Sequence, residues 1–155
     1  MRCALAMCLL LLLAAAQALR VTVIGGTGFV GSRVCQILVA KGADVTSVSK
    51  TGRVPEWAAK EAWSREVKWS AVDLLDGTDA AIDAAIGSPE SVVSCLGVVD
   101  PSPEILKRGN GLANVNAFDA AKRAGVRRVV YVSVASEVAE CEESWLPFAQ
   151  AEFSA

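Results

Sequence analysis

The amino-acid sequence predicts an α/β domain built on a doubly wound parallel sheet of about five strands. Strand-like and helix-like stretches alternate from residue 19 onward. The strand-like stretches are almost continuously apolar, which is typical of parallel strands covered on both faces. The first of them runs into a turn with a glycine at every third position. A chain of 155 residues is long enough for one such domain and its core.

Five stretches are predicted to be strands because they are short, rich in apolar and β-branched residues, and bounded by turn residues. They are residues 19–26, 43–50, 67–74, 91–97 and 127–134. Helices are predicted between them, at residues 28–42, 55–63, 79–86 and 104–124. This order of elements is that of a Rossmann domain.

Start and stop residues bound the predicted helices. The first helix is expected to end at Gly42 and to bury one apolar face. That face holds Val30, Val34, Ile37 and Leu38. Pro55 is expected to start the second helix. Thr78 is predicted to cap the third helix, which Gly87 ends.

The turn GGTGFVG, residues 25–31, predicts a site for a nucleotide diphosphate. Its glycines follow a strand and open a helix, the context in which this spacing is most specific. Gly25 permits the tight turn, Gly28 lets backbone N–H groups approach a pyrophosphate, and Gly31 lets the helix pack closely on the strand. The free amides and the dipole of the helix N-terminus favour an anion. The alternative is an ordinary glycine-rich turn.

The end of the second strand indicates which nucleotide is bound. An NAD-preferring site carries Asp or Glu there for the ribose 2′-hydroxyl, and this chain has Ser49. Lys50 and Arg53 follow, and two cations at this place suit a 2′-phosphate. We therefore expect NADP(H) rather than NAD(H), with a solvated basic loop as the alternative. Asp73, at the end of the third strand, is predicted to accept a hydrogen bond from the adenine amino group.

The composition argues against several classes of function. The chain has no histidine, the commonest general base and metal ligand. A formal net charge of −2 without a basic block argues against a nucleic-acid partner. Its five cysteines show no C-x-x-C spacing, so no metal site is expected. Cys35 and Cys95 are expected to pack in the core.

The two ends of the chain differ from its middle. Residues 1–18 combine one Arg, an apolar run and an Ala-Gln-Ala ending, which predicts a secretory signal cleaved after Ala18; a membrane anchor is the alternative. Such a leader directs a protein to the endomembrane system or serves as the first step of plastid import. We expect the dinucleotide-binding domain at residues 19–136 and a tail at residues 137–155. The tail is either a helix that covers the sheet edge or a segment that docks a partner.

In the order of its motifs, the chain resembles an atypical short-chain dehydrogenase/reductase. The motifs are GGTGFVG from residue 25, VSKTGR from residue 48, VDLLD from residue 72, SCLG from residue 94 and NGLANVNAFDAAKRAGVRRVVYVSV from residue 110. Within that superfamily it is similar to the group of the complex I accessory Rossmann subunit and of proteins linked to coenzyme Q biosynthesis. The resemblance implies a dinucleotide cofactor, a mitochondrial or plastid location and a membrane-associated complex as partner.

The same resemblance implies a set of cofactor contacts drawn from the first turn and from the carboxyl ends of the later strands. These residues are Gly25, Thr27, Gly28, Phe29, Val30, Gly31, Lys50, Arg53, Asp73, Leu74, Cys95, Leu96, Gly97, Asn116 and Ser133.

The Tyr-x-x-x-Lys pair by which these reductases move a proton is absent from the sequence. Tyr131 is the one tyrosine, Ala135 stands four residues on, and no lysine follows Lys122. Phe148 and Glu152 have the right separation and the wrong chemistry. Two functions stay open: a reductase of a small or lipid-like carbonyl that uses an unusual acid, or a non-catalytic module that holds the cofactor within a complex. A truncated chain would also account for the missing pair.

Overall fold

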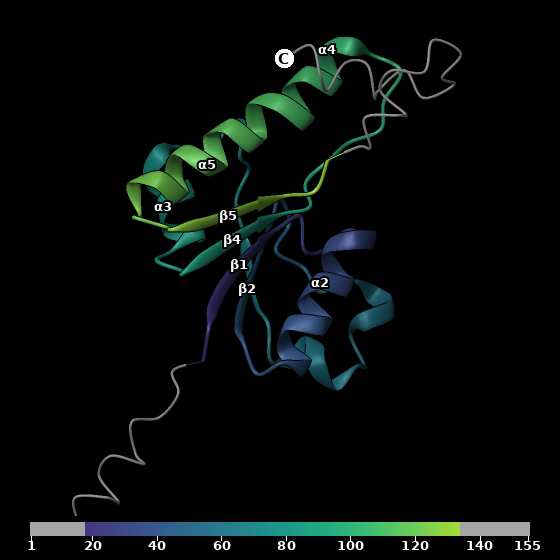
Figure 1. Ribbon diagram of the computed structural model, residues 1–155. Helices are drawn as coiled ribbons and strands as arrows, with labels where there is room; N and C mark the ends of the chain where they lie inside the picture. Colours follow the sequence, from purple (N-terminus) through teal and green to yellow (C-terminus); the bar gives the residue numbers. More distant parts are fainter. Residues whose placement is uncertain (1–17, 134–155) are drawn as a thin grey trace, which may run out of the picture.

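The computed structural model describes residues 18–133, whose strands form a five-stranded sheet (Figure 1). The strands are β1 (Arg20–Ile24), β2 (Asp44–Ser49), β3 (Lys68–Ala71), β4 (Ser91–Ser94) and β5 (Arg128–Tyr131). Their order is β3-β2-β1-β4-β5, and every neighbouring pair is parallel. The order reverses direction between β1 and β4, so the predicted doubly wound sheet is confirmed.

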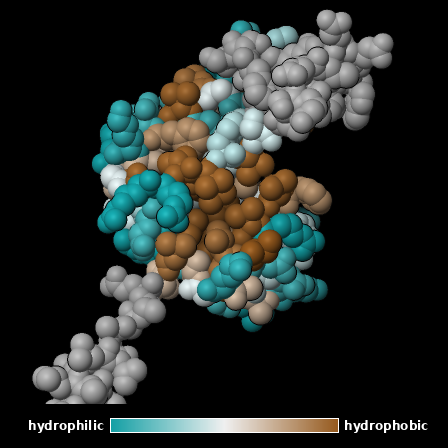
Figure 2. Space-filling model, in the orientation of Figure 1, coloured by the Kyte–Doolittle hydropathy of each residue, from teal (hydrophilic) through white to brown (hydrophobic). Residues whose placement is uncertain are grey.

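Helices cover both faces of the sheet at β1, β2 and β4 (Figure 1), whereas every residue of the edge strand β5 is exposed, within the apolar surface that Figure 2 shows. The helices are α2 (Phe29–Ala40), α3 (Asp79–Ile86), α4 (Pro103–Leu106) and α5 (Ala113–Arg123), with the short 3-10 helices η1 (Glu56–Ala58) and η2 (Ala62–Arg65) and the π-helical segment η3 (Lys107–Leu112). The core on one face takes side chains from α2, η1 and η2, and the core on the other takes them from α3 and α5. In the part of the chain that the structure describes, no helix has the length and apolar character needed to cross a membrane.

The core beneath α2 uses alternate residues of the strands, as the period of two requires. Its buried members are Val21, Val23, Cys35, Val45, Ala58, Trp63 and Val67. The expected core position of Cys35 is therefore confirmed. Cys95 is partly buried against the same cluster.

The predicted apolar face of the first helix is wrong in part. α2 buries the small residues Gly31, Ser32 and Cys35. Val30 and Ile37 are 46% and 55% exposed, whereas Val34 and Leu38 pack against the core from its margin. Small side chains let the helix lie close to the sheet and the glycine turn. The larger aliphatic residues therefore lie at the margin of the buried face or in solvent.

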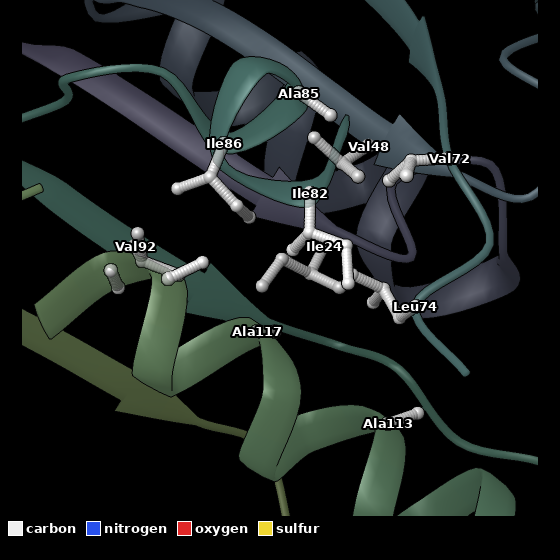
Figure 3. Close-up of a cluster of buried hydrophobic side chains, with 12 residues drawn as sticks. Ile24, Val48, Val72, Leu74, Ile82, Ala85, Ile86, Val92, Ala113 and Ala117 are labelled. Atoms are coloured by element: carbon white, nitrogen blue, oxygen red, sulfur yellow. The ribbon is translucent and has the colours of Figure 1, made fainter. Parts of the chain in front are cut away.

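The opposite core joins β1, β2 and β4 to α3 and α5. In Figure 3, Ile82 and Ile86 of α3 share one cluster with Ile24, Val48 and Val92 on the strands. α5 contributes only alanines to this cluster, so its backbone approaches the sheet closely; they are Ala113, Ala117, Ala120 and Ala121. Burying each branched aliphatic side chain here contributes about 1.5–3 kcal/mol.

Two predicted helices take other forms. The segment predicted as one α-helix at residues 55–63 forms the short 3-10 helices η1 and η2 instead. Ala58 and Trp63, five residues apart, both pack in the core beneath α2, and one α-helix would place them on different sides. The rings of Trp57 and Trp63 lie 6.1 Å apart and those of Trp63 and Trp69 lie 6.3 Å apart. The helix predicted at residues 104–124 runs continuously from α4 to α5, with π-helical geometry in the middle.

Candidate dinucleotide site

The glycine turn between β1 and α2 lies at the carboxyl ends of the strands. Gly25 has a φ of 75°, a left-handed conformation that favours glycine. Its N–H donates to the Val48 carbonyl at 2.8 Å. A Cβ atom on Gly25 would lie 2.9 Å from the Cys95 carbonyl oxygen. Both conformation and space therefore require glycine at this position.

Gly31 sets how closely α2 approaches the turn. A Cβ atom at this position would overlap the Gly25 carbonyl oxygen and would lie 2.8 Å from Cα of Gly26. Gly28 is different, because its backbone is extended and its Cβ would meet only the Gly25 oxygen, at 3.3 Å. The fold therefore requires glycine at position 31. At position 28 a side chain would fit, and its absence leaves the space beside the N-terminus of α2 empty.

The first turn of α2 presents backbone amides to this space. The first intrahelical bond is donated by the Ser32 N–H to the Gly28 carbonyl at 3.0 Å. The N–H groups of residues 29–31 therefore have no partner within the helix. No acidic residue stands in this turn and no side chain caps it. The positive end of the helix dipole is left for an anion.

Two cavities flank the end of β1. The β2 cavity, of about 260 Å³, is lined by residues that include Val48, Lys50 and Asp73. The β5 cavity, of about 380 Å³, is lined by residues from the start of α2 and from the chain after β4 and β5. Leu96 and Val98 line both cavities, so the two adjoin. They meet where the strand order reverses, which is where α/β sheets bind ligands.

The loop after β2 is held in one shape by short-range contacts. The Ser49 hydroxyl accepts from the Gly52 N–H at 3.0 Å. Gly52 has a φ of 60°, and a Cβ atom there would lie 2.8 Å from the Ala71 backbone nitrogen. Lys50 and Arg53 are both exposed on this loop. Lys50 forms an ion pair with Asp73, with 2.6 Å between Nζ and Oδ2.

Asp73 is anchored by its own loop. Its Oδ1 accepts from the Leu75 N–H at 3.0 Å and from the Asp76 N–H at 3.4 Å. The hydrogen bond from Lys50 and that from the Leu75 amide lower the pKa of the Asp73 carboxyl. The bond to Asp73 raises the pKa of Lys50. The two groups are therefore charged together across neutral pH.

Buried asparagines on the helix after β4 shape the loop between the cavities, and sequence reasoning missed them. The Asn110 side chain accepts from the Val98 N–H at 2.7 Å and donates to the Val98 carbonyl at 3.2 Å. Asn114 hydrogen-bonds to the Ser94 hydroxyl and donates to the Asn110 carbonyl at 2.7 Å. The sequence signal that could have identified them is two asparagines four residues apart, on a helix face whose other residues are mostly Gly and Ala.

Asn116, which the sequence did single out, lies on α5 and donates to the Leu74 carbonyl at 2.8 Å. It ties the helix to the chain after β3. Tyr131 lies in β5 as predicted, with its ring edge-on to Phe118 at 6.1 Å.

The two described cysteines carry protonated thiols. Burial, with a smaller effect of the neighbouring Cys95, raises the pKa of Cys35 to about 12. Burial also raises the pKa of Cys95. Thiolate chemistry is therefore disfavoured at both.

The structure brings most of the predicted contact residues to the two cavities. Lys50, Asp73, Leu74 and Leu96 line the β2 cavity, and Gly28, Phe29, Val30, Cys95, Leu96, Gly97 and Ser133 line the β5 cavity. Gly25, Thr27, Gly31, Arg53 and Asn116 line neither. Within residues 18–133, no group of three or more acidic, cysteine or histidine side chains is placed to hold a metal ion.

A model of the NAD dependent epimerase/dehydratase family matches residues 21–154. The chain belongs to this family. Membership confirms the resemblance to short-chain dehydrogenases/reductases at the level of the superfamily, whose extended branch includes the epimerase/dehydratase proteins. The fold of the family is a Rossmann fold that binds a nicotinamide dinucleotide. The narrower resemblance to the complex I and coenzyme Q group stays a prediction.

Relatives of this epimerase/dehydratase chain are known from plants and fungi. An uncharacterized chloroplastic protein of Arabidopsis thaliana is 38% identical over 117 residues, which are 74% of this chain and 36% of the relative. MIOREX complex component 2 of Saccharomyces cerevisiae is 35% identical over 83 residues, 52% of this chain and 29% of the relative. The chain thus spans about a third of the length of the curated relatives that it matches.

Among solved structures, the Bordetella bronchiseptica enzyme WbmH in complex with NAD+ superposes with a TM-score of 0.67. The sequences are 18% identical, and the match covers 89% of this chain and 51% of WbmH. At that identity the likeness establishes the fold alone.

Proposed function

We propose that this chain binds NADP(H), with the pyrophosphate at the N-terminus of α2. The single observation that carries the proposal is the bare first turn of that helix. Its amides have no partner within the helix, it holds no acid, and Gly28 keeps side chains away from it. The residues present therefore fit a diphosphate.

The adenosine half of the cofactor is proposed to lie in the β2 cavity. That cavity has apolar walls from β1, from β2 and from the chain after β3, with Asp73 and Lys50 as its charged groups. Arg53 stands exposed on the adjoining loop, three residues beyond Lys50. A guanidinium and an ammonium beside the ribose would favour a 2′-phosphate over a 2′-hydroxyl. This charge placement supports NADPH over NADH.

The nicotinamide half is proposed to lie in the β5 cavity. Cys95, Leu96 and Gly97, which follow β4, and Ser133, which follows β5, line this cavity. Apolar contact here would orient the ring, and the bound cofactor would supply hydride chemistry. Thr27 and Asn116 line neither cavity. Thr27 is proposed to hold the glycine turn in shape, and Asn116 is proposed to hold the loop after β3 through its bond to Leu74.

For the overall role we propose a reductase-like protein in which the Tyr-x-x-x-Lys pair is missing. A non-catalytic accessory role in a membrane-associated organellar complex is the second candidate. It is favoured by the relatives, one of which is named chloroplastic and another a component of the MIOREX complex. NADPH oxidation with quinones or aldehydes separates the two, because only the reductase would show turnover. A fluorescent fusion that carries the leader would show whether the chain enters an organelle.

Cofactor binding is tested by titrating the full chain with NADPH and with NADH and following nucleotide fluorescence. We expect tighter binding of NADPH. Arg53→Glu should weaken NADPH binding on the order of tenfold and NADH binding much less, since it reverses the charge beside the 2′ position. Arg127→Glu makes the same charge change at the amino end of β5 and serves as the control. Equal affinities of the wild type for both nucleotides would refute the 2′-phosphate assignment.

A further inference from the structure

The ion pair between Lys50 and Asp73 lies where the adenosine half of the cofactor is proposed to bind. Both residues line the β2 cavity, whose other walls are mostly apolar. Their charged atoms are 2.6 Å apart. One of the two cations assigned to the 2′-phosphate therefore already has an anionic partner.

The two members of the pair differ in mobility. The Asp73 side chain is 26% exposed and is fixed by backbone N–H groups through Oδ1, which leaves Oδ2 for Lys50. The Lys50 side chain is 77% exposed and has a flexible stem. Asp73 is the fixed member, and it determines where the ammonium lies.

Neither Asp76 nor Arg53, two other charged residues near this pair, takes part in it. Asp76 lies in the same loop and forms its ion pair with Arg108, at 3.7 Å. Arg53 takes part in none of the ion pairs found among residues 18–133. The loop after β2 thus carries one restrained cation and one that is available to a ligand.

We propose that Asp73 is a specificity-determining positioning residue that holds Lys50 across the β2 cavity and so limits its contact with the cofactor's 2′ position. This inference rests on the proposed dinucleotide binding. Arg53 then carries most of the preference for a 2′-phosphate. Neutralising Asp73 should release Lys50 to the phosphate and raise that preference.

Asp73→Asn is the informative variant, because the Asn side-chain oxygen can still accept from the Leu75 and Asp76 amides. The ratio of NADH to NADPH dissociation constants, measured by fluorescence titration of the full chain, should rise about threefold to fivefold, the upper part of the range for an exposed ion pair. Asp76→Asn removes the same charge from the same loop without touching Lys50, so its ratio should stay near that of the wild type.

A double variant tests whether Asp73 acts through Lys50. In a Lys50→Met background, Asp73→Asn should leave the ratio unchanged. Direct repulsion between Asp73 and the phosphate would persist in that background and would overturn the inference. Should Asp73→Asn alone fold poorly, removal of both charges in Lys50→Met/Asp73→Asn gives a second test. Its ratio should match the wild type, whereas Arg53→Met should lower the ratio.

Two failures are distinguishable. A wild-type chain that binds neither nucleotide overturns the proposed function and this inference with it. A wild type that binds, together with an Asp73→Asn ratio equal to that of the wild type, overturns only the role of Asp73.

Discussion

We expect the substitution Gly28→Val to weaken cofactor binding strongly and to lower the free energy of unfolding only slightly. Gly28 caps α2 with φ −78° and ψ 176°, an extended conformation that valine adopts without strain. The nearest atom to a Cβ there is the Gly25 oxygen at 3.3 Å. The cost in unfolding free energy should be about 1 kcal/mol, the usual loss when an aliphatic residue replaces a favourable N-cap.

The effect on binding should be much larger. A valine side chain would occupy the space through which a phosphate reaches the amides of residues 29–31. A hydrogen bond to a charged group contributes about 1.5–3 kcal/mol. Blocking two of them would cost about 3 kcal/mol or more, which raises the dissociation constant for NADPH on the order of a hundredfold.

Gly31→Ala is the matched comparison, because its added Cβ would overlap the Gly25 carbonyl oxygen. Backbone atoms surround it, so the turn itself must shift. Overpacking of this kind costs about 1–3 kcal/mol, and replacing glycine within a helix returns about 1 kcal/mol. Gly31→Ala should therefore lose stability as well as binding.

The assays are urea unfolding without ligand and fluorescence titration with NADPH. If Gly28→Val bound NADPH with wild-type affinity, the assignment of the pyrophosphate to the start of α2 would be refuted. If Gly31→Ala left both the unfolding free energy and the affinity unchanged, the claim that α2 lies too close to the Gly25 carbonyl for any side chain at position 31 would be refuted.

Three further predictions follow from the described contacts. The pKa of Cys35 is raised to about 12 from 9.0, so its contribution to stability is complete below about pH 9 and is lost as the pH rises toward 12. The slope is about 1.4 kcal/mol per pH unit, and urea unfolding of Cys35→Ala should show a shallower alkaline loss than the wild type. Asn114→Ala removes the acceptor of the buried Ser94 O–H group and the donor to the Asn110 carbonyl, so it should cost about 2–3 kcal/mol by urea unfolding. The half-buried Asn116→Ala should cost about 1 kcal/mol, and equal losses would contradict this reading. NADPH affinity should fall more steeply with added NaCl than NADH affinity, because salt would screen the proposed contact between the 2′-phosphate and the exposed Arg53. Parallel salt dependence in the titrations would argue against that contact.

The sequence alone determined the fold and the place of the glycine turn. Apolar strands alternating with helix patterns predicted a parallel sheet, and all five strands lie within the predicted ranges. The spacing of Gly25, Gly28 and Gly31 predicted a turn into a helix, and the turn has that form. These features depend on the periodicity and conformational preferences of neighbouring residues, which are local properties of the chain.

Tertiary structure decided which side chains meet. It placed Lys50 against Asp73 from the ends of two different strands, and it set Asn110 and Asn114 beneath the loop after β4. It also turned the small residues of α2 inward and left Val30 and Ile37 exposed. Such outcomes depend on distances between segments far apart along the chain, and those distances are set only when the helices pack on the sheet.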